Sequence, residues 1–275
     1  MGKKQNLIDN NLYHEMWNFA QTTLIAHGMR RREISDYFEN FSLKLPFLFR
    51  LGFRCSNIGI RLISFESKSV AVATITTMEK PKGSSYFCNS AFFIRPSADL
   101  RAPVLHSDAL DPMVGVKGMF EMDLYNCNQA DVNIDNFFGD NLSKIKEALE
   151  IVEPYQKTAE QGRGKYTVYL EPYLHKPRIE LQQPDAGDVE ALKRFYQDEL
   201  TAFKLYLEAY LSSLSRLTPE KGIVENNKIG FEKFMGEVLE KDIAVKTGKR
   251  IFKDDFQKYF HEGCWRTGYY GKNIT

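Results

Sequence analysis

Apolar residues recur every three or four positions near the beginning of the chain and through much of its second half. A repeat of about 3.6 residues places such side chains on one face of a helix, so each stretch predicts an amphipathic helix that turns this face to a core. Gly28 and Pro219 follow the first and the longest stretch and end them. The predicted helices cover 12–26, 34–41, 141–155, 189–217, 229–239, 245–252 and 256–260.

Between these helices the pattern changes to alternation of apolar and polar residues or to short β-branched runs. A repeat of two places alternate side chains on opposite faces of a strand. The clearest case is 119–124, where Phe120, Met122 and Leu124 share one face, while Glu121 and Asp123 make the other face polar. The predicted strands cover 58–63, 70–77, 86–94, 116–125 and 166–170.

Short polar turns connect the early strands, which is typical of an antiparallel meander. The chain contains neither an internal repeat nor a low-complexity linker. We therefore predict a single domain over 1–275, with 1–45 as an N-terminal helical extension. Its class is α/β (α+β), a three-layer α/β/α sandwich with a central, mainly antiparallel sheet of about six strands.

Charge and cysteine content exclude several function classes. The chain has 37 Lys and Arg against 36 Asp and Glu, and this net charge of +1 gives no reason to expect binding to nucleic acid. Its four cysteines lie far apart without a CxxC pair, so neither zinc nor a disulfide framework is indicated. No apolar run approaches the roughly 20 residues of a membrane span. We expect a soluble monomer in a reducing compartment, without membrane contact.

The stretch 85–126 contains the most specific chemistry. It predicts a strand, a bend with two prolines, a segment with His106 and Asp108, a glycine-containing turn and a second strand. Apolar neighbours would desolvate the Asp108 carboxyl and raise its pKa, so that it carries a proton near neutral pH. The alternative is that Asp108 caps a turn before Asp111 and Pro112. No phosphate-binding loop, nucleophile elbow or zinc signature is present.

Two ordered motifs carry a resemblance to a known family. Asn89, Pro96, Pro103, Asp108 and the strand end Met122-Asp123-Leu124 resemble the central motif of the ferredoxin-dependent bilin reductases. More than 100 residues later, the paired Phe231 and Phe234, the step Glu240-Lys241-Asp242 and the stretch from Ile251 to Tyr259 are similar to the closing pattern of that family.

The resemblance implies roles for individual residues. Asp108 corresponds to the central proton donor, and Asp242 to a second acid on the helix side of the pocket, used where the A-ring diene is reduced. The alternative for Asp242 is a solvated helix residue or an N-cap. His106 replaces a family glycine and would contact the bilin, unless it faces outward. Asn89 lies seven residues before Pro96, whereas the family spacing falls on Ala91, so Asn89 reaches that position only through a two-residue bulge.

The implied reaction is the reduction of a linear tetrapyrrole, biliverdin or a dihydrobiliverdin, by single electrons from external ferredoxin and without a bound cofactor or metal. Retention of both acids favours the phycoerythrobilin-forming type. Arg95, Arg101 and Lys117 are candidate partners for the bilin propionates, with a solvated position as the alternative. Basic residues at helical spacing predict a ferredoxin docking stripe. These residues are Lys246, Lys249, Arg250 and Lys253.

Two other functions remain open. A non-catalytic tetrapyrrole-binding or carrier protein would keep the pocket without needing a proton donor. A red chlorophyll catabolite reductase-like enzyme is a related alternative, because its fold resembles the same superfamily. The resemblance implies a cytoplasmic location, or the stroma of a plastid for a mature algal protein.

Overall fold

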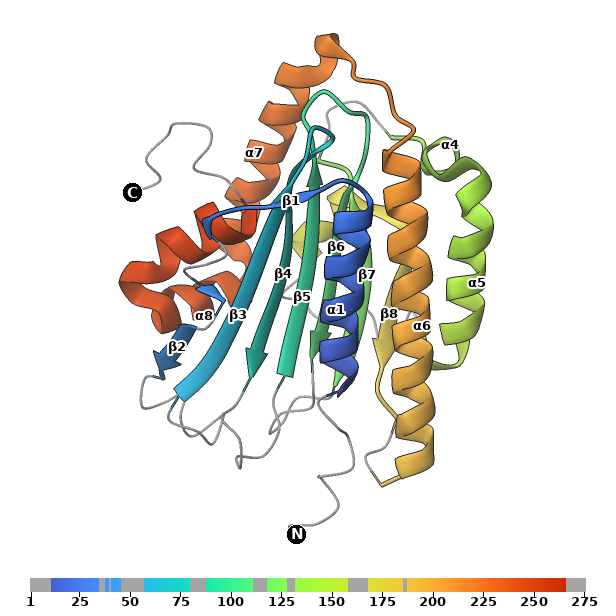
Figure 1. Cartoon of the computed structure of the whole chain (residues 1–275), viewed down its shortest axis with the longest axis vertical. Helices are drawn as coiled ribbons and strands as arrows, with labels where there is room; N and C mark the ends of the chain where they lie inside the picture. Colours follow the sequence, from blue (N-terminus) through green and yellow to red (C-terminus); the bar gives the residue numbers. More distant parts are fainter. Residues whose placement is uncertain are drawn as a thin grey trace.

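The structure is a computed structural model that describes residues 11–34, 38–39, 41–45, 57–79, 88–110, 118–127, 132–157, 168–184 and 187–265. Within these residues, eight strands form one sheet, and every pairing is antiparallel. Helices cover both faces of this sheet (Figure 1). The predicted α/β/α sandwich with an antiparallel sheet is confirmed, with more strands than expected.

Six strands form a simple meander in which each strand pairs with the next along the chain. They are β3 (Asn57–Glu66), β4 (Val70–Glu79), β5 (Cys88–Pro96), β6 (Val104–Leu110), β7 (Met119–Tyr125) and β8 (Leu174–Gln182). Two short N-terminal strands, β1 (Arg30–Arg31) and β2 (Phe41–Lys44), both pair with β3. Residues 1–45 therefore contribute strands to the sheet in addition to the helix predicted there.

One face of the sheet is covered by α1 (Asn11–Ala26) and α6 (Val189–Leu214), with α5 (Leu142–Val152) beside α6 (Figure 1). The short helices α4 (Ile134–Phe138), η2 (Gly139–Asn141) and η3 (Glu153–Tyr155) flank α5. The side chain of Asp188 caps α6 by accepting a hydrogen bond from the Ala191 amide at 2.9 Å. Phe203 of α6 makes edge contacts with Phe19 and Phe92, so these layers share one aromatic core.

The other face is covered by α7 (Val224–Lys241), α8 (Ile243–Phe252) and a π-helix, η7 (Gln257–Trp265). Three 3₁₀-helices are interspersed along the chain: η4 (Val168–Tyr173) precedes β8, η5 (Lys221–Ile223) precedes α7, and η6 (Lys253–Asp255) joins α8 to η7. Phe231, Phe234, Met235 and Val238 recur on one side of α7 and are buried against the sheet. Among the described residues, no helix is both long and apolar enough to span a bilayer.

Several predicted elements were wrong. The segment 104–110, expected to lie between a bend and a turn, is the central strand β6, which pairs with both neighbours over its length. The structure therefore contradicts the alternative that Asp108 caps a turn. The strand predicted at 166–170 is replaced, from Val168 onward, by η4, whereas β8 was not predicted. Phe41 begins β2 instead of ending a helix.

Candidate functional site

The centre of the sheet carries a group of polar side chains on the face that α7 and α8 cover. Along β6, Leu105 and Ala109 belong to the core under α6, so alternation turns His106 and Asp108 to the opposite face, together with Val104. Asp108 pairs with Ala91 of β5 and Glu121 of β7, while His106 pairs with Phe93 and Asp123. We call His106, Asp108, Glu121 and Asp123 the polar patch.

Burial differs strongly within the polar patch. Asp123 is fully buried at 0% exposure, and the hydroxyl of Tyr125 donates to its Oδ2 at 3.2 Å. Asp108 and His106 are half-buried. The Nδ1 atom of His106 is buried and has no hydrogen-bond partner within the described part of the chain. Because such orphaned atoms are uncommon in folded proteins, a polar ligand atom is a plausible partner for it.

The carboxylates also form a row across three strands, since Asp108 lies opposite Glu121 and Glu121 lies opposite Glu180 of β8. Like charges in directly opposed positions repel, so neighbouring cations stabilise such a row. Glu180 has such cations, because Lys157 and Arg178 approach its carboxylate oxygens at 3.0 and 3.8 Å. The register that brings these acids together was not evident from the sequence.

Tyr259 of η7 lies on the same side of the sheet as the polar patch. It is 5% exposed, and its ring stacks on Phe252 with centroids 3.9 Å apart. Burial raises the pKa of Tyr259 well above its ordinary value, and the nearby Cys264 and Asp108 act in the same direction. The phenol therefore stays protonated at neutral pH. Its hydrogen-bond partner Thr76 lies in the same cross-strand row as Ala91 and Asp108.

The two arginines predicted to bind propionates differ in burial: Arg95 is buried and Arg101 is exposed. Arg95 is only 6% exposed, with its guanidinium carbon 3.8 Å from the centroid of the Phe231 ring and its Nη1 donating to the Trp265 carbonyl at 3.5 Å. Its solvated alternative is therefore wrong. Arg101 forms an exposed ion pair with Glu220 at 3.1 Å, and the hydrogen bond that it donates to this carboxylate raises the pKa of its guanidinium. Lys117 lies outside the described residues.

Asn89 does not reach the position opposite Asp108. β5 and β6 pair without a register shift from Asn89↔Leu110 to Ile94↔Leu105, so the two-residue bulge that Asn89 would need is absent. Ala91 occupies that position instead. Ala91, not Asn89, is therefore the residue of β5 next to Asp108 in the sheet.

Asp242 follows the last residue of α7 and lies four residues after Val238, on the inward side of this helix. Its Oδ1 accepts a hydrogen bond from the Val245 amide at 3.1 Å, which caps α8. Its Oδ2 accepts a hydrogen bond from the hydroxyl of Tyr169 in η4. The N-cap that was the alternative for Asp242 is confirmed. Asp108 thus lies in the sheet, whereas Asp242 lies in the helical layer that covers it.

The basic residues predicted to form a docking stripe are all exposed on α8 and η6. We call Lys246, Lys249, Arg250 and Lys253 the basic stripe. The Nζ atom of Lys249 lies over the Phe256 ring, 5.7 Å from its centroid, in the geometry of a cation–π contact. The geometry leaves their docking role as a prediction.

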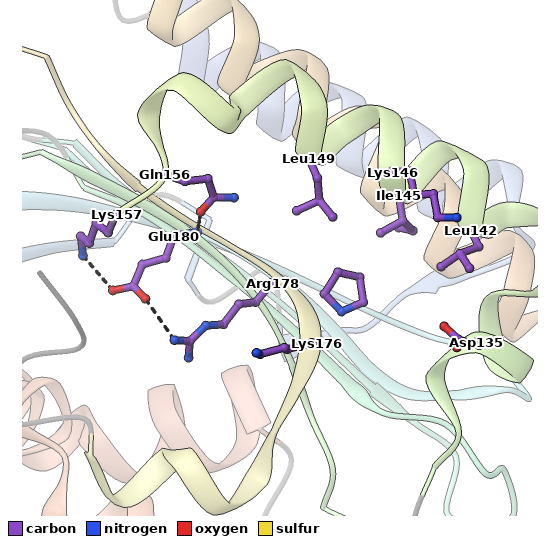
Figure 2. A pocket seen from close by; sticks show the side chains of 11 residues that line it. Asp135, Leu142, Ile145, Lys146, Leu149, Gln156, Lys157, Lys176, Arg178 and Glu180 are labelled. Atoms are coloured by element: carbon purple, nitrogen blue, oxygen red, sulfur yellow. Dashed lines mark hydrogen bonds and ion pairs between the residues drawn. The ribbon is translucent and has the colours of Figure 1, made fainter. Parts of the chain in front are cut away.

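A groove of about 550 Å³ lies beside β8, the edge strand next to the polar patch, and Glu180 contributes to its lining. Figure 2 shows Leu142, Ile145 and Leu149 of α5 pointing toward β8, which contributes Lys176 and Arg178. The groove combines an apolar wall with a positively charged rim, a lining that was not predicted from the sequence. A smaller cavity next to Arg95 is bounded by Phe231 and Cys127. Within the described residues, no cluster of His, Cys, Asp and Glu side chains is suited to a metal ion.

No protein-family model matches the chain. No curated protein matches its sequence. Among solved structures, the fold is similar to the crystal structure of phytochromobilin synthase from tomato in complex with biliverdin. The TM-score is 0.62 and the identity 15%, over 91% of this chain and 83% of the tomato chain. At this identity the likeness shows a shared fold, and the residues of the site must support any function.

Proposed function

We propose that the protein reduces a linear tetrapyrrole, biliverdin or a dihydrobiliverdin, with single electrons from ferredoxin and with Asp108 as the central proton donor. The observation that carries the proposal is the position of Asp108. It lies in the middle of the sheet face under the C-terminal helices, opposite the small Ala91. The fold similarity to a synthase crystallised with biliverdin supports the same substrate class.

Reduction of a bilin between the sheet and the C-terminal helices requires a supply of protons where water is excluded. Each two-electron reduction of a double bond consumes two electrons and two protons, and a positioned side chain supplies a proton more readily than excluded water. Asp108 is half-buried on this sheet face, directly opposite Glu121, and would supply that proton. His106, with its orphaned Nδ1, would hold a polar atom of the bilin beside this acid.

The proposal assigns a second role to Asp242, as the acid for the A-ring diene. An enzyme of the phycoerythrobilin-forming type would use Asp108 in one reduction and Asp242 in the next, and would release a four-electron product. Arg95 would hold one propionate, because a buried guanidinium binds a carboxylate through two parallel hydrogen bonds. On the outer surface, the basic stripe would receive the acidic ferredoxin.

The test combines binding and turnover. Biliverdin is added to the protein without oxygen, the shift of its visible absorption is recorded, and reduced ferredoxin is then supplied. We expect spectral progression to a reduced bilin with the native protein. Asp108→Asn should keep the binding shift but slow turnover by about 10²-fold or more, the usual effect of losing a general acid. Asp140→Asn, on the exposed η2, is the matched control and should behave like the native protein.

Two results would contradict the proposal. If biliverdin binds but its spectrum never progresses while a known bilin reductase works in parallel, the carrier function is favoured instead. If Asp108→Asn and Asp140→Asn turn over equally fast, Asp108 is not the central proton donor.

A further inference from the structure

Two tyrosines of η4 donate hydrogen bonds to two acids near the end of α7. The hydroxyl of Tyr169 donates to Oδ2 of Asp242, and the hydroxyl of Tyr173 donates to Oε1 of Glu237 at 2.7 Å. The two pairs are chemically alike and come from the same pair of elements. Their surroundings differ, and this difference suggests different roles.

Glu237 is held as an anion. Lys241 binds its other oxygen, Oε2, at 2.8 Å, and the hydrogen bonds from Lys241 and Tyr173 lower the pKa of this carboxyl. The ring of Tyr173 packs edge-on against Phe234 with centroids 5.1 Å apart. Tyr173 therefore connects η4 to α7 as part of the core. Because its pKa is lowered, the Glu237 carboxyl stays ionised near neutral pH.

Asp242 has a different set of contacts. The backbone amide of Val245 occupies Oδ1, so Oδ2 is the oxygen that meets a side-chain hydroxyl. Both Asp242 and Tyr169 are half-buried, between the aromatic layer and the surface. A phenol hydroxyl both donates and accepts hydrogen bonds, so Tyr169 can receive a proton from water on one side and pass one to Oδ2 on the other.

We propose that Tyr169 is a positioning residue that returns protons to Asp242. This inference rests on the proposed function, in which Asp242 gives up a proton to the bilin. The Tyr169 O–H bond then breaks as its proton passes to Oδ2, while a water molecule from solvent donates a proton to the phenol oxygen. The net change is one proton moved from solvent to Asp242, with Tyr169 restored and no electron transferred.

The experiment compares four proteins, native, Tyr169→Phe, Tyr173→Phe and Asp242→Asn, in the ferredoxin assay with biliverdin. Products are separated by chromatography during turnover. We expect Tyr169→Phe to accumulate the two-electron intermediate, with the second reduction slowed on the order of tenfold. Added imidazole, a small diffusible acid, should restore the second reduction. Tyr173→Phe should give the native product ratio. Thermal unfolding of each variant verifies that it is folded.

The outcomes separate this inference from the proposed function. If Asp242→Asn accumulates the intermediate but Tyr169→Phe does not, the relay is wrong and the role of Asp242 stands. If Tyr169→Phe is slow but imidazole does not restore it, Tyr169 only shapes the site and the relay is again wrong. If Asp242→Asn itself gives the native product ratio, the second acid of the proposed function fails, and the relay with it.

Discussion

The two faces of the sheet differ in what they bury. Under α1 and α6, the sheet contributes Leu105, Ala109, Phe120, Met122 and Leu124, an almost wholly apolar set. Under α7 and α8, the neighbouring positions of the same strands carry the polar patch. Burying a polar group costs free energy unless it is hydrogen-bonded, so the second face depends on hydrogen bonds such as the one from Tyr125 to Asp123. One face is a continuous apolar core, and the other combines an apolar core with the polar patch.

The largest effect on folding should come from the apolar face. Phe203 is 1% exposed and contacts Phe19 and Phe92, so Phe203→Ala leaves a cavity between three elements. We expect the free energy of unfolding to fall by about 3–5 kcal/mol. Urea titration measures this change. Bilin binding by the remaining folded protein should stay native, and a changed bilin spectrum would argue against a separation of roles between the faces.

A smaller effect on stability, joined to an effect on the ligand, should come from the polar face. Tyr125→Phe removes one hydrogen bond to the fully buried Asp123, and a hydrogen bond to a charged group contributes about 1.5–3 kcal/mol. Because Asp123 is paired with His106 across the strands, the absorption of bound biliverdin should shift as well. A loss of stability with an identical bilin spectrum would place the ligand away from this part of the sheet.

The smallest effect on the folded protein should come from the surface. Lys249→Gln with Arg250→Gln removes two charges of the basic stripe without touching the core. We expect the KM for ferredoxin to rise several-fold at low salt, while bilin binding and thermal stability stay native. The control is Lys193→Gln with Arg194→Gln on the exposed side of α6. Equal losses in both double variants would contradict docking at the stripe.

The helices and the regular strands could be predicted from periodicity because one side of each is apolar. β6 was missed because His106 and Asp108, which face the site, are polar. They interrupt the apolar pattern of Val-Leu-His-Ser-Asp-Ala-Leu, so the segment resembles a bend. β8 was missed because Lys176, Pro177 and Arg178 are poor strand residues, which an edge strand tolerates.

The site could be predicted only in part. Asp108 and His106 were identified from a local motif, and the structure places them side by side on one strand face. Their neighbours Thr76, Glu121 and Tyr259 depend on strand register and on packing between distant segments, which no local pattern encodes. The contact of Tyr169 with Asp242 spans 73 residues for the same reason.

The pairing of both β1 and β2 with β3 has a consequence for any shortened form of the protein. These two strands protect the outer hydrogen-bonding edge of β3, and Leu43 and Leu45 join the core beneath the C-terminal helices. A chain that begins after Leu45 would expose a long edge strand, a surface that recruits strands from other molecules. Removal of these N-terminal residues would thus favour self-association.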